Sequence, residues 1–175
     1  TVNRFLHMRH APERNAQIGL TASGVSTSHA ENAIKEIEAL PYAGEVKRIA
    51  NQLQDLNNRT LDVLLEGEVI DKELYDLLKS KYKHHIPLNR VFEDTEDVGS
   101  VIAGRPLDVR STGIMRAKGS LREIDDIQAN IVTNYEQAII RAEKNRVDLA
   151  TLKFARDNPQ SELFEEIKPK AIGKT

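Results

Sequence analysis

Apolar side chains recur every three to four positions through most of this chain, a spacing that predicts amphipathic α-helices. The longest pattern covers residues 120–158, which contain no glycine or proline. Ser120 and Glu123 match the S-x-x-E capping box at its start, and Pro159 ends it because a proline disfavours helix in the residue before it. We therefore expect one helix, roughly 57 Å long, against which the other helices pack. Its apolar stripe comprises Ile124, Ile127, Ile131, Tyr135, Ala138, Ala142, Leu149 and Leu152.

The N-terminal region predicts two shorter helices. The first covers residues 3–20 and should bend at its internal proline, because proline lacks the amide hydrogen that the preceding turn needs. Ser28 and Glu31 form a second capping box after a small polar loop, and Pro41 ends the helix that follows. The side chains expected to face inward are Phe5, Met8, Pro12 and Ala16 in the first helix, and Ala30, Ile34, Ile37 and Leu40 in the second.

Residues 43–82 predict an antiparallel αα-hairpin. One helix covers residues 43–66, and Asp71 caps another that runs to about residue 82. Gly67 suits the end of the first helix because glycine adopts positive φ without a steric clash. The turn GEVI is short, so the two helices should lie side by side. The inward side chains are expected to be Val46, Ile49, Leu53, Leu56, Thr60, Val63 or Leu64, then Leu74, Leu77, Leu78 and Tyr82.

Residues 83–119 differ from the rest because they show no helical period. Irregular stretches of this length inside a domain are usually functional or disordered. The predicted organisation is one all-α domain: N-terminal helices over residues 1–82, an irregular arm over 83–119, the long helix, and a loose tail over 159–175. The fold class is an antiparallel helical assembly around the long C-terminal helix, with the arm inserted between helices.

Composition limits the classes of function. The chain has 175 residues, of which 39% are hydrophobic, enough for one core. A net charge of −2 gives no general attraction to nucleic acid, and no apolar run approaches a membrane span, so no membrane partner is expected. The absence of cysteine excludes disulfides and thiolate metal sites. Because the sequence opens without methionine, we expect a piece of a longer polypeptide.

Two groups of polar residues in predicted helices could form a buried clamp. Arginine, carboxylate and amide side chains pair with good geometry, and Arg141 and Asn145 lie one helical turn apart. The hypothesis is that these residues fasten the first helix, or the turn around Arg90, to the long helix; a solvated face is the alternative. The proposed clamp comprises Glu13, Arg14, Asn15, Arg90, Arg141, Glu143 and Asn145. We would then expect Glu143→Ala to lower the melting temperature clearly.

Other candidate sites have simpler explanations. His7, His10 and Glu13 are spaced like metal ligands on a helix, but no further ligand follows at a recognisable spacing, so we expect no metal and no other cofactor. A basic stretch could contact phosphates without reading bases, or pair with acidic groups of the same or another protein. Its residues are Arg105, Arg110, Arg116, Lys118 and Arg122. No nucleophile, nucleotide or metalloprotease motif is present, so no catalytic residue is predicted.

Three short motifs carry a resemblance to a known family. HAPERN covers residues 10–15, IPL-x-R covers 86–90, and AIIRAEKNRV covers 138–147. In this order they resemble the helical domain of large polyvalent phage and prophage proteins of the PLxRFG type. The turn here reads PLNRVF, which departs from the family label after the arginine.

The resemblance implies a non-catalytic structural or interaction module of a virion-carried DNA-ejection or anti-defence protein. Its partners would be other domains of the parent polypeptide or other virion proteins. It would occur in the virion, and in the host cytoplasm after ejection. Two alternatives remain open: a module that contacts nucleic acid through the basic stretch, and the accessory lobe of an enzyme completed by sequence outside this chain. The long stripe is equally suited to pairing with a second copy in an oligomer.

Overall fold

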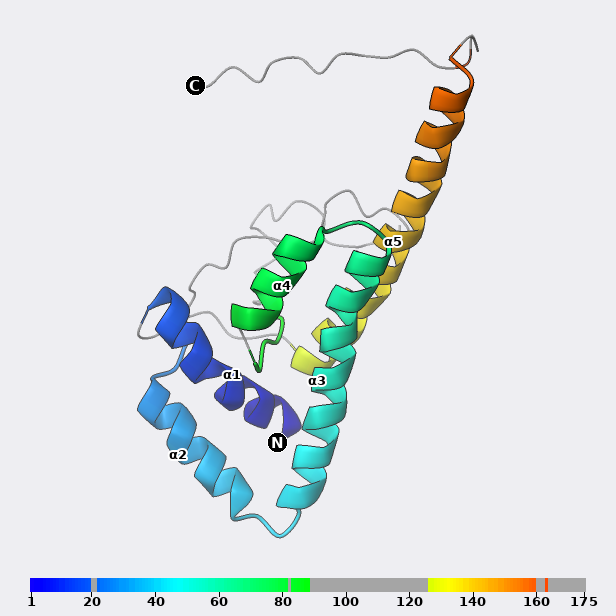
Figure 1. Ribbon diagram of the computed structural model, residues 1–175. Helices are drawn as coiled ribbons and strands as arrows, with labels where there is room; N and C mark the ends of the chain where they lie inside the picture. The colour runs from blue at the N-terminus through cyan, green and yellow to red at the C-terminus, as the bar shows by residue number, and fades with distance from the viewer. Residues whose placement is uncertain (20–21, 82, 89–125, 160–162, 164–175) are drawn as a thin grey trace, which may run out of the picture.

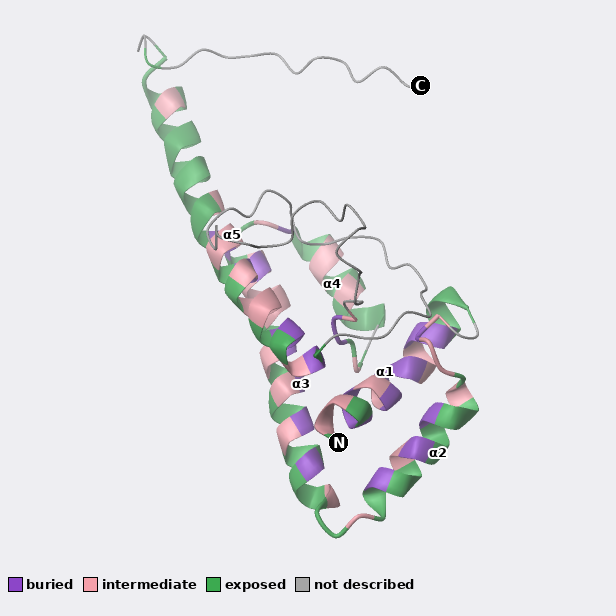
Figure 2. Ribbon diagram, turned by 180° about the vertical axis from the view of Figure 1, so that it is seen from behind, coloured by how far each residue is buried: buried purple, intermediate pink, exposed green. Residues whose placement is uncertain are grey.

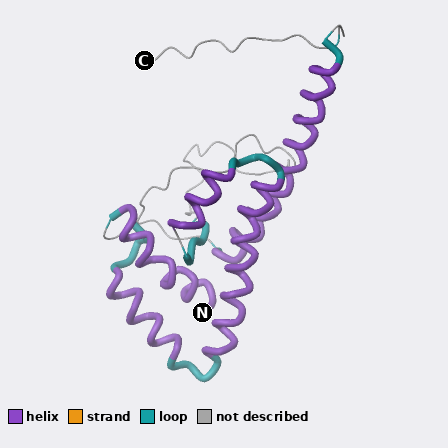
Figure 3. Tube along the Cα trace, viewed as in Figure 1, coloured by secondary structure: helices purple, strands orange, loops and turns teal. Residues whose placement is uncertain are grey.

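A computed structural model describes residues 1–19, 22–81, 83–88, 126–159 and 163. These residues form helices and the loops between them, and contain no strand (Figures 1 and 3). The predicted all-α class and the long C-terminal helix are therefore confirmed. The helices are α1 (Val2–Ile18), α2 (Thr27–Glu38), α3 (Ala43–Glu66), α4 (Lys72–Lys81) and α5 (Ile127–Asp157).

Helix α3 is the element that the others share. Helices α1 and α2 form an antiparallel pair that contacts the first half of α3, and α4 turns back beside the second half (Figure 1). The predicted αα-hairpin of α3 and α4 is thus confirmed. Helix α5 makes the most extensive contact with α3 and runs in the same direction, so this pair is parallel (Figure 1).

The largest hydrophobic cluster lies where α1, α2, α3, the start of α5 and the segment after α4 meet (Figure 2). Burying such aliphatic side chains supplies most of the stability of amphipathic helices. Ile86 and Ile131 in this cluster have no exposed surface. The buried members of the cluster are Phe5, Leu6, Ile37, Val46, Ala50, Ile86, Ile127 and Ile131.

Two predicted helix starts are wrong, in both cases because another side chain makes the cap. Helix α2 is capped by Ser26, whose hydroxyl accepts a hydrogen bond from the His29 amide at 3.2 Å, and not by Ser28. Helix α5 is capped by Asp126, whose carboxylate accepts from the amides of Gln128 and Ala129 at 2.9 and 3.3 Å. The helix therefore begins later than the predicted capping box at residues 120–123, which lies outside the described residues.

The turn after α3 corrects the role predicted for Gly67. Its φ is −82°, and the next residue, Glu68, carries the positive φ of 55°. The amides of Glu68 and Val69 bond to the carbonyls of Leu65 and Leu64, which is the Schellman pattern of helix termination. Asp71 then caps α4 as predicted, by accepting from the Leu74 amide at 2.8 Å.

Helix α1 is continuous through Pro12 and presents a different face from the one predicted. Phe5 and Met8 are buried as expected, but Ala16 is exposed. Polar residues take several of the other buried positions, and two of them, Arg14 and Asn15, bond to backbone groups of the loop before α2. The buried side of α1 comprises Phe5, Leu6, Met8, His10, Ala11, Arg14 and Asn15.

The second half of α5 extends beyond the other helices (Figure 2). Ile124 of the predicted stripe lies outside the described residues. From Ile127 to Ala142 the stripe is buried except for the partly buried Tyr135, but Leu149 and Leu152 are 37% and 44% exposed. The physical reason is that α3 ends beside Ala142, so its surface covers only the first half of α5. Helix α4 is also less buried than predicted, since Leu77 is exposed and none of its residues is fully buried.

Candidate functional site

The end of α1 holds the loop that leads to α2. The Asn15 amide group donates to the Val25 carbonyl at 2.9 Å, and its carbonyl oxygen accepts from the Ser23 amide at 3.1 Å. The Arg14 guanidinium donates to the Ala22 carbonyl at 3.2 Å. These side chains thus satisfy loop backbone groups that would otherwise be buried without partners.

A second set of hydrogen bonds ties the segment after α4 to both α1 and α3. We call this set the polar junction; it consists of His10, Glu13, Gln54, Asn57, His84 and His85. Gln54 and Asn57 of α3 both donate to the His85 carbonyl, at 2.9 and 2.8 Å. The Glu13 carboxylate accepts from the His84 backbone amide at 2.9 Å. The next residue, Ile86, enters the hydrophobic core, so the junction positions one of the most buried side chains.

In the polar junction, the pKa values of His10 and His85 both lie below the ordinary value for histidine. His10 has no exposed surface, and its ring meets the ring of His85 edge-on at a centroid distance of 5.4 Å. Burial, followed by the nearby His85, Arg14 and His7, lowers the pKa of His10 to about 3. Burial among protein atoms and the Arg14 charge also lower the pKa of His85, but its side chain is exposed and bulk water limits the effect.

At the C-terminal end of α3, the backbone of Gly67 lies closer to α5 than a residue with a Cβ atom could. We call this the tight contact; it consists of Gly67, Ala142 and Asn145. A Cβ atom placed on Gly67 would lie 2.4 Å from the Ala142 Cβ and 2.7 Å from its Cα. The Asn145 side chain donates to the Gly67 carbonyl at 2.8 Å. The tight contact therefore requires glycine for space, with one hydrogen bond fixing its direction.

The structure distributes the described residues of the proposed clamp over separate places. Glu13 belongs to the polar junction and Asn145 to the tight contact, while Arg14 and Asn15 hold the loop before α2. Arg141 is partly buried and donates to Gln137 on its own helix at 3.3 Å.

Glu143 pairs with Arg146 at 2.5 Å on the exposed side of α5. The strong destabilisation expected for Glu143→Ala therefore has no structural basis, because exposed pairs of this kind contribute little.

Several predicted site residues lie outside the described part of the chain. They are Arg90 and the proposed phosphate-contacting residues Arg105, Arg110, Arg116, Lys118 and Arg122. Within the described ranges, no group of three or more His, Asp or Glu side chains is placed to hold a metal ion. Within the same ranges, no helix has the length and apolar character needed to cross a membrane.

Sequence reasoning missed Gln54 and Asn57, which sit on the buried side of α3. Two amide side chains three positions apart, within the apolar stripe of an amphipathic helix, were the available signal, because buried amides need partners. The contact of Gly67 with Ala142 left no signal of its own, since a glycine after a helix is ordinarily explained by the helix end.

Comparison of the chain with models of protein families, with curated protein sequences and with solved structures finds no match. In both the polar junction and the tight contact, side chains bond mainly to backbone groups of other segments. Such an arrangement holds helices and loops together.

Proposed function

We propose that this chain is a non-catalytic structural and interaction module of a larger polyvalent or DNA-ejection phage protein. The observation that supports an interaction role is the distal half of α5, which extends beyond the helical body (Figure 2) and carries exposed apolar residues. Val147, Leu149 and Leu152 are 64%, 37% and 44% exposed. The phage context rests on the resemblance of the HAPERN, IPL-x-R and AIIRAEKNRV motifs.

The hydrogen bonds within the body fit a module that keeps one shape while it presents a surface. Polar groups of α1 and α3 are used to fix loops and segments, as the Asn15 and Asn57 bonds show. A rigid body of this kind would hold the projecting helix at a constant angle for a neighbouring domain of the parent polypeptide or for another virion protein. The module would thus occur in the virion and, after ejection, in the host cytoplasm.

The reading frame that encodes the chain provides the first test. We expect it to continue well beyond this segment and to encode further domains, and we expect peptides of the segment in purified virions by mass spectrometry. A reading frame confined to these residues, or absence of the peptides from particles that contain the other structural proteins, would contradict the proposal.

The role of the projecting helix is tested by binding. The module and the adjacent segments of the parent polypeptide are expressed separately and mixed, and their complex is measured by sedimentation. We expect Leu149→Glu to weaken the complex without changing the melting temperature of the module. Leu77→Glu is the matched control, because Leu77 is similarly exposed, at 47%, but lies on α4. Equal weakening by both variants would show that α5 has no special role.

A further inference from the structure

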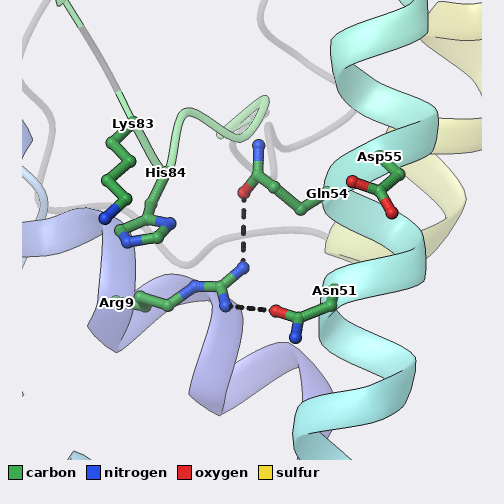
Figure 4. A pocket seen from close by; sticks show the side chains of 6 residues that line it. All are labelled: Arg9, Asn51, Gln54, Asp55, Lys83 and His84. Carbon is green, nitrogen blue, oxygen red and sulfur yellow. Dashed lines mark hydrogen bonds between the residues drawn. The ribbon is translucent and has the colours of Figure 1, made fainter.

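A hollow of about 320 Å³ opens between α1, α3 and the residues that follow α4 (Figure 4). It borders the polar junction but is lined by a different set of charges. The lining residues are Arg9, Asn51, Gln54, Asp55, Lys83 and His84. The volume lies at the lower end of the range of small-molecule sites, roughly 300–1,000 Å³.

The Arg9 guanidinium is the best-positioned cation in this hollow. It donates to the side-chain oxygens of Asn51 at 2.8 Å and of Gln54 at 3.5 Å, which orient it without neutralising its charge (Figure 4). Its Nε is buried and has no hydrogen-bond partner in the described part of the chain. Burial lowers the pKa of Arg9, so the surroundings disfavour its charge. An anion in the hollow would place a second negative charge beside Arg9, in addition to the attraction from Glu13.

Two further nitrogen-bearing side chains face the same space. His84 has a buried Nδ1 that makes no hydrogen bond to any described residue. The pKa of His84 is lowered by burial and then by the charge of Arg9, with a smaller contribution from Lys83, so both cations act on this ring. Among the described residues, the Lys83 ammonium forms no hydrogen bond or ion pair. These groups can donate to, or attract, the same anion.

The carboxylates near the hollow do not cancel this charge. Asp55 of α3 lines the hollow and is its one lining carboxylate, against the two lining cations Arg9 and Lys83 (Figure 4). Glu13 attracts Arg9, but its carboxylate already accepts the hydrogen bond from the His84 amide. The lining side chains thus carry two positive charges and one negative charge, a net charge of +1.

We propose that this hollow binds the phosphate group of a small molecule. Arg9 donates through the terminal nitrogens of its guanidinium, the His84 ring borders the anion, and Lys83 supplies a second positive charge at the opening. A phosphate group fills only part of the volume, so the remainder can take a small group esterified to it. The shared chemistry is that of a phosphate dianion, whether it arrives as inorganic phosphate or as a nucleoside monophosphate.

The proposal is tested by NMR on the full chain at neutral pH. Sodium phosphate replaces sodium chloride at constant ionic strength, and the side-chain amide signals of Asn51 and Gln54 are followed. We expect saturable shifts with a Kd on the order of millimolar, as for a small anion held by a few charged contacts. Non-saturable drift of these signals, or no shift, would overturn the proposal.

Variants separate a specific site from general attraction of anions. Lys83→Gln should weaken binding about tenfold, since a charged contact contributes roughly 1.5–3 kcal/mol, and it removes no bond within the described structure. Arg9→Gln should abolish saturation. Arg4→Gln is the control: Arg4 lies on the same helix but pairs on the surface with Glu36 at 3.0 Å. An equal loss of affinity in the Lys83 and Arg4 variants would refute a defined site.

A parallel titration with adenosine monophosphate identifies the source of the phosphate. Binding at least about tenfold tighter than inorganic phosphate, which corresponds to about 1.4 kcal/mol, would support a nucleotide-like ligand in the remaining volume. Equal affinity for the two would support a site for the phosphate group alone. Failure of both ligands to shift the signals would overturn the proposal, without affecting the interaction role of α5.

Discussion

Helix α3 is held in its middle by hydrogen bonds and at its C-terminal end by close packing. In its middle, Gln54 and Asn57 donate to the backbone of His85, so the polar junction depends on hydrogen-bond direction and on uncharged histidine. At its end, Gly67 lies against Ala142, so the tight contact depends on the absence of a side chain. Acid should therefore disrupt the first, and a single added methyl group should disrupt the second.

The largest effect is expected at the tight contact. Gly67→Ala places a Cβ atom 2.4 Å from the Ala142 Cβ and 2.7 Å from its backbone Cα, so helix α5 must move away. We expect the free energy of unfolding to fall by about 3 kcal/mol, the upper range for overpacking of a rigid contact. Urea denaturation followed by circular dichroism measures the change.

Gly44→Ala is the matched control for this prediction. Gly44 lies in the first turn of α3, and a Cβ there would meet nothing within 4 Å. Because alanine favours helix over glycine, this variant should be as stable as the parent or up to about 1 kcal/mol more stable. Ala142→Gly should partly rescue Gly67→Ala. Equal stability of the two alanine variants, or no rescue, would show that the chain ends can adjust around the contact.

The second effect is a loss of stability in acid that comes from the polar junction. The pKa of His10 is about 3 in the folded protein against 6.5 for the free side chain, so the unfolded chain binds more protons between these values. Stability is therefore complete above pH 6.5 and falls as the pH falls toward 3. The expected loss from His10 is about 2 kcal/mol between pH 7.5 and 5, at 1.36 kcal/mol per pKa unit.

Urea denaturation at a series of pH values tests this slope. His10→Gln removes the titrating ring and should flatten the dependence, although it also lowers stability at neutral pH. His29→Gln is the control, because His29 lies exposed on α2 and its replacement should leave the slope unchanged. If the His10 variant kept the parent slope, the acid sensitivity would come from other groups.

The third effect concerns the two donors to the His85 carbonyl. Either Gln54→Ala or Asn57→Ala leaves one donor in place, so each should cost only about 1 kcal/mol. The double variant leaves the carbonyl without both bonds, and we expect a loss greater than the sum of the single losses by about 1 kcal/mol. Gln17→Ala, at an exposed position of α1, is the control. Strict additivity would mean that the two amides act independently.

The helices were predictable from sequence because local signals agreed with the tertiary structure. The bounds of α3, the Asp71 cap and the hairpin follow from apolar spacing and capping chemistry, and each is confirmed. The starts of α2 and α5 were not, because several Ser and Asp side chains near each start could cap, and packing selects among them. Coverage of Leu149 and Leu152 was also unpredictable, since it depends on where α3 ends relative to α5.

The sites were less predictable than the helices because they join residues far apart in sequence. The HAPERN segment was recognised as a holding element, but its partners are the loop before α2 and the residues after α4. Nothing local to Gln54 or Asn57 specifies the His85 carbonyl as their acceptor. The hollow around Arg9 likewise combines residues from three separate segments, so no spacing within one segment reports it.

The smallest effect is expected one residue from the tight contact and defines how local that contact is. Glu143 follows Ala142 on α5 but points to solvent, where it pairs with Arg146. Glu143→Ala should change the free energy of unfolding by less than about 0.5 kcal/mol, because an exposed ion pair is screened by water. Asn145→Ala should cost about 1 kcal/mol, since it removes the bond to the Gly67 carbonyl at 2.8 Å. A larger loss for the Glu143 variant would mean that α5 is held at this level by charge and not by its close approach to Gly67.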